Sequence, residues 1–349
     1  QIGALTTTQL SKLTTTQVAA LTTTQLGALT STQVAGLSTA QLRGLDTTDI
    51  TNLTTTQVAG LTATQIGALT TTHLAALETT DLAALTTTQI RGIAASSIGA
   101  LNTTQVAALT TTQVGALTAS QVAGLDSTDI AALTTTQIGA LSSTQTAALT
   151  TTPLRGIETT DLAVLTTTQI RGLGATQLAS LSTTQFGAIT TTQIGALTNT
   201  QLLGLKSSQL AALTTTQLGA LSSTQIGALT SAQLAGFSTT NIAALTTTQV
   251  AGLLAGRIGG LTTVQVAALE TTDLVTLTTT QLIGLSTTQI AALSTTQVAA
   301  LTTTQVAGLL PARMPGFEST DIAALTTTQV AALTSAQLAA LTTTQLRGL

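Results

Sequence analysis

The chain has 349 residues, of which 6% are charged and 1% are aromatic, and its formal net charge at pH 7 is −3. A globular domain usually contains about 25% charged residues, so this composition differs from that of an ordinary enzyme domain. The absence of cysteine excludes disulfides and thiolate metal sites. The absence of a basic stripe argues against a nucleic-acid partner, and no apolar run is long enough to predict a membrane span.

An eight-residue repeat begins within the first few residues and continues to the last residue. When Leu5 is taken as position one, every eighth residue up to Leu349 is Leu, Ile or Phe, and no insertion or deletion breaks the register. Position six is also apolar, with Thr146 as its only polar occupant. The consensus is L-T-T-T-Q-[ILV]-[AG]-[AG]. A fixed period of this kind is typical of repeat architectures, so residues 1–349 are predicted to form a single continuous octad-repeat solenoid, a fragment of a longer array.

Each octad contains the sequence signature of a helix start. Position two holds mostly Thr or Ser, whose oxygen can accept a hydrogen bond from a free N–H group of the first helical turn. Gln at position five completes a capping box, and the apolar residues at positions one and six form a hydrophobic staple. A strand would require apolar residues at every second position. We therefore predict an all-α repeat solenoid of very short helices, with a β-solenoid of 16-residue coils as the alternative.

The charged residues support the helical prediction and suggest a longer period. All acidic residues occur as pairs at positions two and five, the helix N-terminus, where the helix dipole favours negative charge. The acidic octads are always an even number of octads apart, which predicts two octads, or about 16 residues, per solenoid turn. The pairs are Asp46/Asp49, Glu78/Asp81, Asp126/Asp129, Glu158/Asp161, Glu270/Asp273 and Glu318/Asp321.

The sequence offers few candidates for chemistry. His73, the single histidine, stands at position five among threonines, so we interpret it as a substitution for Gln rather than as a ligand or general base. The acidic pairs could suggest calcium, but calcium takes six to eight oxygens from a dedicated loop, and each pair stands alone. The prediction is therefore that there are no catalytic, cofactor-binding or metal-binding residues, that no cofactor is required, and that the chain is not an enzyme.

Two octads and one residue type suggest contacts with a partner. The octads Leu253–Gly260 and Leu309–Gly316 have Leu at position two and Arg at position five. They are either a contact point for a partner or a lateral neighbour, or tolerated variation within the repeat. Rows of threonine could match ice or a polysaccharide, although ice-binding solenoids usually present a flat β face and helix caps engage many hydroxyls.

The run L-T-T-T-Q-[IV]-[AG]-A-L, found at Leu13–Leu21 and Leu133–Leu141, resembles the octad arrays of very large secreted bacterial surface proteins, often described as adhesin-like or haemagglutinin-like. The resemblance covers the whole chain and implies an extracellular stalk, fibre or matrix component at the cell surface. The resulting hypothesis is a structural extracellular repeat protein that forms a rigid filament, fibre or surface stalk and self-associates through its nearly uncharged surface. The alternative is an ice-binding or polysaccharide-binding adhesin that acts through ordered threonine rows.

Overall fold

A computed structural model describes all residues from Gln1 to Leu349. It contains 42 α-helices, two 3-10 helices and no strands. The all-α prediction is therefore confirmed, and the β-solenoid alternative is wrong. The chain divides into two compact units, Gln1–Ser180 (unit 1) and Leu181–Leu349 (unit 2). None of the helices combines the length and apolar character needed to cross a bilayer.

The helices follow one another with one helix in each octad. Those of unit 1 are η1 (Ile2–Ala4), α1 (Thr7–Leu10), α2 (Thr15–Ala19), α3 (Thr23–Gly27), α4 (Ser31–Ala35), α5 (Thr39–Gly44), α6 (Thr47–Asn52), α7 (Thr55–Ala59), α8 (Ala63–Ala68), α9 (Thr71–Ala76), α10 (Thr79–Ala84), α11 (Thr87–Gly92), α12 (Ala95–Ile98), α13 (Thr103–Ala108), α14 (Thr111–Ala116), α15 (Ala119–Val122), α16 (Ser127–Ala132), α17 (Thr135–Gly139), α18 (Ser143–Ala148), α19 (Thr151–Leu154), α20 (Thr159–Val164), α21 (Thr167–Gly172) and α22 (Ala175–Ser180).

The same arrangement is found in unit 2, where one octad forms a 3-10 helix. Its elements are α23 (Thr183–Gly187), α24 (Thr191–Gly195), α25 (Asn199–Gly204), α26 (Ser207–Ala211), α27 (Thr215–Gly219), α28 (Ser223–Ala228), α29 (Ser231–Leu234), α30 (Thr239–Ala243), α31 (Thr247–Ala251), α32 (Ala255–Ile258), α33 (Thr263–Ala267), α34 (Thr271–Leu274), α35 (Thr279–Ile283), α36 (Thr287–Ile290), α37 (Thr295–Ala300), α38 (Thr303–Gly308), η2 (Pro311–Gly316), α39 (Ser319–Ala324), α40 (Thr327–Ala331), α41 (Ser335–Ala339) and α42 (Thr343–Leu346).

The predicted capping box begins most of these helices. In α31 the N–H of Gln249 donates to the Thr246 hydroxyl oxygen at 3.3 Å, and the N–H of Thr246 donates to Gln249 Oε1 at 2.9 Å. The helix ends at Ala251, and the N–H of Leu253 donates to the Val250 carbonyl at 3.0 Å. The next octad then begins, so each α-helix is limited to between four and six residues by the two signals that flank it.

Helices that are three positions apart in the series pack against one another. The pairs α2·α5, α3·α6, α8·α11 and α28·α31 are examples. Gln41 of α5 hydrogen-bonds the carbonyls of Leu13 and Leu10, which lie 28 and 31 residues earlier. One turn therefore takes about 28 residues, or three and a half octads. The predicted turn of two octads is wrong, because two octads are too short to bring the chain back over itself.

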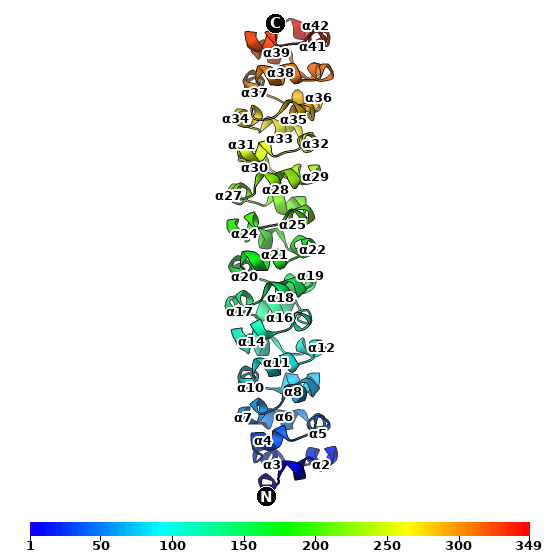
Figure 1. Ribbon diagram of the computed structural model, residues 1–349, viewed down its shortest axis with the longest axis vertical. Helices are drawn as coiled ribbons and strands as arrows, with labels where there is room; N and C mark the ends of the chain where they lie inside the picture. Colours follow the sequence, from blue (N-terminus) through cyan, green and yellow to red (C-terminus); the bar gives the residue numbers. More distant parts are fainter. The chain divides into compact units, whose positions relative to one another are not determined.

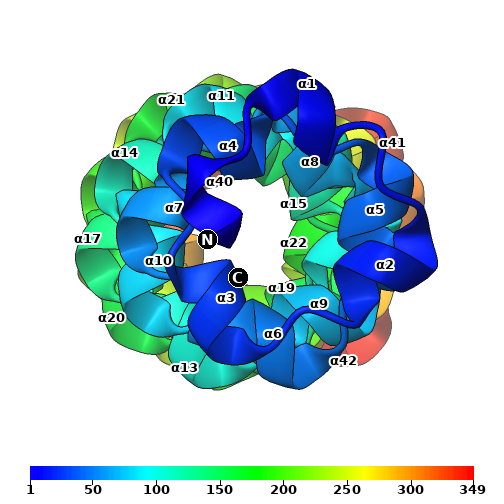
Figure 2. The ribbon, with the colours of Figure 1, turned by 90° about the horizontal axis from the view of Figure 1, so that it is seen from below.

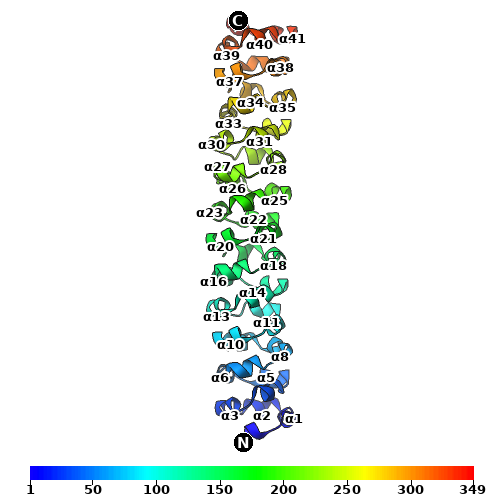
Figure 3. The same cartoon turned by 60° about the vertical axis from the view of Figure 1, so that its left-hand side comes forward.

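The figures show how these turns are built within each unit. In Figure 3, α5 lies above α2 and α6 lies above α3, as their contacts require. Figure 1 shows the same layering at other levels of unit 1 and of unit 2. Seen from the N-terminal end, α1, α2, α3 and α4 follow one another clockwise as the chain recedes from the viewer (Figure 2). Unit 1 is therefore a right-handed solenoid.

Positions one and six form the apolar core of each unit. Val250 at position six is 0% exposed, and Leu253 at position one is 2% exposed. Thr146, the one polar residue at position six, is also buried, and its hydroxyl donates to the carbonyl of Ser143 at 2.9 Å or of Gln169 at 3.1 Å. Small residues at positions seven and eight let adjacent turns approach, since a Cβ on Gly252 would lie 2.6 Å from the Ser223 carbonyl oxygen.

Candidate functional site

The glutamine at position five connects each turn to the turn before it. Gln57 is 2% exposed, and its Oε1 accepts the N–H of Thr54 at 2.8 Å, as the capping box predicts. Its Nε2 donates to the carbonyls of Leu26 at 2.9 Å and Leu29 at 2.7 Å, in the preceding turn. The oxygen of this buried amide thus caps its own helix, and its nitrogen hydrogen-bonds the adjacent turn.

We call these residues the glutamine ladder, meaning the position-five glutamines whose Nε2 donates to the position-one carbonyl of the preceding turn, as Gln57 does to Leu29. Such bonds satisfy carbonyls that would otherwise be buried without a donor, which costs free energy. Members include Gln33, Gln41, Gln57, Gln65, Gln89, Gln105, Gln113, Gln121, Gln145, Gln233, Gln249, Gln265, Gln297, Gln305 and Gln337.

The cap was predicted from the sequence, but the glutamine ladder was not. A signal for it was present, because a capping box accepts Glu as readily as Gln, yet no octad has Glu at position five. All four glutamates stand at position two. Glutamine occupies most of the position-five sites, and its amide supplies an N–H donor in addition to the acceptor that a capping box needs.

Two other residue types at position five keep the bond to the preceding turn. His73 is buried, and its Nε2 lies 3.1 Å from the Leu45 carbonyl oxygen, 28 residues earlier. The amide nitrogen of Asn241 donates to the Leu213 carbonyl at 3.0 Å, again 28 residues earlier. His73 therefore takes the place of a glutamine, as interpreted from the sequence.

The acidic pairs stand at helix starts as predicted, with a difference between Asp and Glu. Asp46 and Asp126 accept the N–H of the residue three positions later, at 2.8 and 2.9 Å. The glutamates make no such side-chain hydrogen bond. Their side chain is one methylene longer than that of Asp, the residue type preferred at this position.

The aspartates at position five have no N–H to donate to the preceding turn. Burial raises the pKa of Asp49, Asp129 and Asp321 above its usual value. Burial raises the pKa of Asp273 furthest, to about 6, and the adjacent Glu270 carboxylate adds to the shift. These carboxyls lie where a consensus octad has an amide, so they are sites where the ladder is interrupted.

The acidic octads of unit 1 lie on one side of that unit. Seven octads make two turns, so Glu158, fourteen octads after Asp46, stands four whole turns beyond it. Glu78 stands four octads after Asp46, which is half an octad more than one turn. Asp126 stands ten octads after Asp46, which is half an octad less than three turns. The turn of three and a half octads, rather than a two-octad period, therefore explains where the acidic octads occur along unit 1. No three His, Asp, Glu or Cys side chains come together in the structure in a way that could hold a metal ion.

The family model of the ALTTAQ repeat matches most of the chain, at residues 1–31, 34–71, 42–79, 74–111, 96–127, 122–153, 154–191, 171–199, 194–231, 266–303 and 314–349. The chain belongs to the ALTTAQ repeat family. No curated protein matches it with significance. Apart from residues 32–33, the matches leave out residues 232–265 and 304–313. These two longer stretches contain all or part of the two Leu-Leu octads of this ALTTAQ repeat chain.

Both Leu-Leu octads lack the two polar signals of the ALTTAQ repeat. Leu254 and Leu310 make no cap hydrogen bond, and Leu254 is 61% exposed. The buried Nε atoms of Arg257 and Arg313 have no hydrogen-bond partner. The second of these octads begins seven octads after the first, which equals two turns, so the two lie on one side of unit 2.

The 3-10 helix η2 forms in the second Leu-Leu octad, which contains two prolines. Pro311 stands at the start of η2, where a missing N–H is tolerated. Pro315 lies inside the element and cannot donate a helical hydrogen bond. The octad keeps a helical path through these changes but not the α-helical hydrogen bonding of its neighbours.

The arginines at position seven also contact the adjacent turn. The Nε atoms of Arg43 and Arg91 donate to the carbonyls of Ala68 and Ala116, each 25 residues later and at the C-terminal end of a helix, at 2.7 Å. Arg43 and Arg91 also stand in the last turn of their own helices, α5 and α11. They thus hold the C-terminal end of a helix in the following turn.

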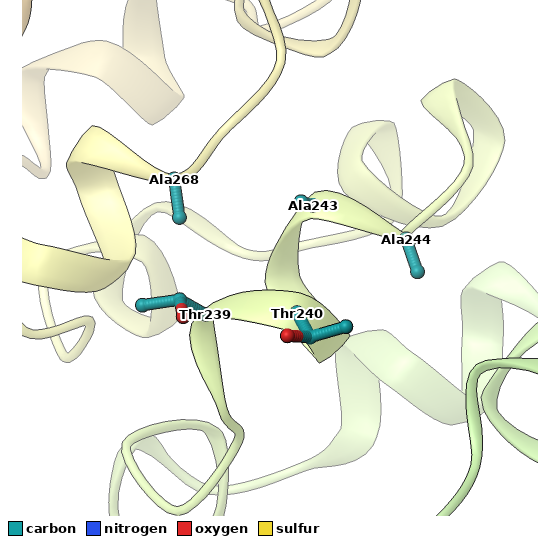
Figure 4. Close-up of a pocket in the computed structure, with 5 residues that line it drawn as sticks. All are labelled: Thr239, Thr240, Ala243, Ala244 and Ala268. Atoms are coloured by element: carbon teal, nitrogen blue, oxygen red, sulfur yellow. The ribbon is translucent and has the colours of Figure 1, made fainter.

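Threonine and alanine dominate the exposed surface of this ALTTAQ repeat chain. Figure 4 shows a shallow pocket in unit 2 where Thr239, Thr240, Ala243 and Ala244 of the α30 octad lie beside Ala268, from the following turn. None of these side chains titrates. The pocket offers methyl groups and two hydroxyls.

Proposed function

We propose that this ALTTAQ repeat chain is a structural extracellular segment that serves as a stiff filament, fibre or surface stalk. The glutamine ladder carries the proposal. The side-chain amide of Gln249, for example, accepts the N–H at the start of its own helix and donates to two carbonyls of the preceding turn. Because such bonds recur from turn to turn, bending or stretching a unit would break buried hydrogen bonds at every level.

The surface chemistry supports a structural role over a catalytic one. The single histidine, His73, is buried beside the Leu45 carbonyl, and the pocket of Figure 4 is lined by Thr and Ala alone. A catalytic site would need titratable groups that converge on a substrate. We therefore propose that the chain catalyses no reaction and acts by its length, its stiffness and its contacts with neighbouring molecules.

The proposed location is the outside of a bacterial cell. Support comes from the resemblance of the runs at Leu13–Leu21 and Leu133–Leu141 to arrays in secreted surface proteins. Labelling of intact cells with an antibody raised against residues 1–349 tests this part of the proposal. Surface labelling without permeabilisation is the expected result, and labelling only after permeabilisation would contradict it.

Two measurements on the purified chain test the structural role. Sedimentation velocity at low concentration should give a frictional ratio well above that of a compact globular protein of 34.8 kDa. At rising concentration, negative-stain images should show filaments or lateral bundles, because a surface with little charge does not keep molecules apart. Compact monomers at every concentration would overturn the proposal.

A further inference from the structure

Asp273 and its surroundings contain hydrogen-bond acceptors without a donor. Asp273 is 2% exposed, and its Oδ2 atom has no hydrogen-bond partner. At this position of a consensus octad, an amide donates to the carbonyl 28 residues earlier, as Gln249 does to Leu221 at 2.7 Å. For Asp273 the equivalent acceptor is the Leu245 carbonyl, and no side chain donates to it. Buried acceptors without a donor are costly, so the site requires a further group.

Another octad with a short side chain at position five shows which group fits. Asn241 has the same length and shape as Asp, and its amide nitrogen reaches the Leu213 carbonyl at 3.0 Å. From this equivalence we infer that the carboxyl of Asp273 lies within reach of the Leu245 carbonyl. Two oxygen atoms at such a separation repel each other when both are acceptors and form an ordinary hydrogen bond when one carries a proton.

We propose that Asp273 binds a proton and donates it in a hydrogen bond to the Leu245 carbonyl, so that this link between adjacent turns of unit 2 closes and opens with pH. The carboxyl oxygen is the donor and the carbonyl oxygen the acceptor, and loss of the proton to solvent leaves the link broken. In the closed form the carboxyl of Asp273 replaces the amide of a ladder glutamine.

The electrostatic surroundings favour the protonated form. α34 packs against α31 and α37, which contain only Thr, Gln, Val and Ala. The α30 octad, which precedes Leu245 in the chain, has no charged residue either. Glu270, at the start of α34, is thus the one charged group nearby, and it is negative. Burial and this carboxylate together raise the pKa of Asp273 to about 6.

The sign of the effect on stability follows from this shift. The folded chain holds the proton up to about pH 6, whereas the unfolded chain releases it near the ordinary value of 3.8. The contribution to stability is therefore fully present below about pH 4 and is lost as the pH rises to about 6. Above that range the ionised carboxyl faces a carbonyl and contributes nothing to the link.

The test compares the thermal unfolding of the full chain and two reciprocal variants between about pH 4 and pH 8. Asp273→Asn installs a permanent donor, so its melting temperature should equal that of the parent near pH 4 and exceed it near pH 8. Asn241→Asp should show the reverse, with a new loss of stability as the pH rises. Equal pH profiles for the parent and Asp273→Asn would overturn the proposal.

Two further measurements test directly which group occupies the site. In a ¹³C titration, the Asp273 carboxyl and the Leu245 carbonyl carbons should shift together, with one midpoint near 6. A carboxyl midpoint near 3.8, or a Leu245 carbonyl that does not move with it, would contradict a shared proton. Excess calcium chloride should leave the melting temperature near pH 8 unchanged. A rise in the parent that is absent in Asp273→Asn would show that a cation, rather than a proton, occupies the site.

Discussion

The octads of α31 and α32 follow one another in the sequence but differ in their polar bonds. In the α31 octad, Gln249 donates to the carbonyls of Leu218 and Leu221 at 2.9 and 2.7 Å. In the α32 octad, Leu254 provides no cap and the buried Nε of Arg257 has no partner. Both octads nevertheless form a helix over the preceding turn. The apolar residues therefore determine the path of the chain, while the polar bonds add to its stability.

If the apolar residues determine the path, the largest effect should come from the core of the α32 octad. Ile258 is 1% exposed, and Ile258→Ala should destabilise unit 2 by about 2–5 kcal/mol. Thermal unfolding followed by circular dichroism measures the change. Leu254→Ala is the matched control, because Leu254 is exposed, and it should change stability by less than about 0.5 kcal/mol. Similar effects of the two variants would refute the comparison.

The second largest effect should come from the ladder. Gln249→Met keeps the bulk of the side chain and removes its donor. The Leu221 carbonyl is then buried without a partner, whereas the Leu218 carbonyl still accepts the N–H of Leu221. The expected cost is about 1–3 kcal/mol for each acceptor left without a donor, measured by thermal unfolding.

Gln17→Met is the control for that variant. Gln17 accepts the N–H of Thr14 at 2.8 Å, but it is exposed, and residues 1–349 include no residue 28 positions before it. Loss of one exposed hydrogen bond should cost less than about 1 kcal/mol. An equal cost for the two variants would show that the bond to the preceding turn adds nothing to the cap.

The comparison also predicts that the α32 octad can be repaired. Leu254→Thr restores a cap and Arg257→Gln restores the ladder bond, so the double variant should gain about 1–2 kcal/mol. Amide hydrogen exchange of Ile258 should slow at the same time, because local opening of the octad becomes rarer. Unchanged exchange would show that the α32 octad has compensating contacts.

The smallest effect should come from a single cap. The Thr128 hydroxyl donates to the Asp126 carboxylate at 2.6 Å, and this bond lowers the pKa of Asp126. The stability that it contributes is present above the ordinary pKa of 3.8 and is lost as the pH falls below it. Thr128→Val should raise the pKa of Asp126 toward 3.8, as followed by ¹³C titration of its carboxyl, and should leave the folded chain intact at pH 7. An unchanged pKa would show that the backbone N–H groups alone hold the carboxylate.

The short helices were predictable from the sequence, but the length of the solenoid turn was not. The helix starts at Thr246 and Gln249 were predictable because a capping box involves residues only three positions apart. The bond from Gln249 to Leu221 was not predictable. Because the octads are nearly identical, the contact across a whole turn produces no longer repeat that could be recognised in the sequence. The spacing of the acidic residues was a long-range signal, but it had two explanations. It fits a period of two octads in the sequence, and it also fits a position on one side of unit 1. Asp273 was explained as a cap, and its burial against the preceding turn was visible only in the structure.

A cysteine cross-link tests the turn of three and a half octads most directly, since the chain has no cysteine of its own. A Cβ placed on Gly44 lies 3.5 Å from the Cβ of Thr15, which suits a disulfide. The pair Thr15→Cys/Gly44→Cys should therefore form an intramolecular disulfide on mild oxidation. The pair Gly44→Cys/Gly60→Cys, two octads apart, should stay reduced. Cross-linking of the second pair but not the first would contradict the glutamine ladder and the turn built on it.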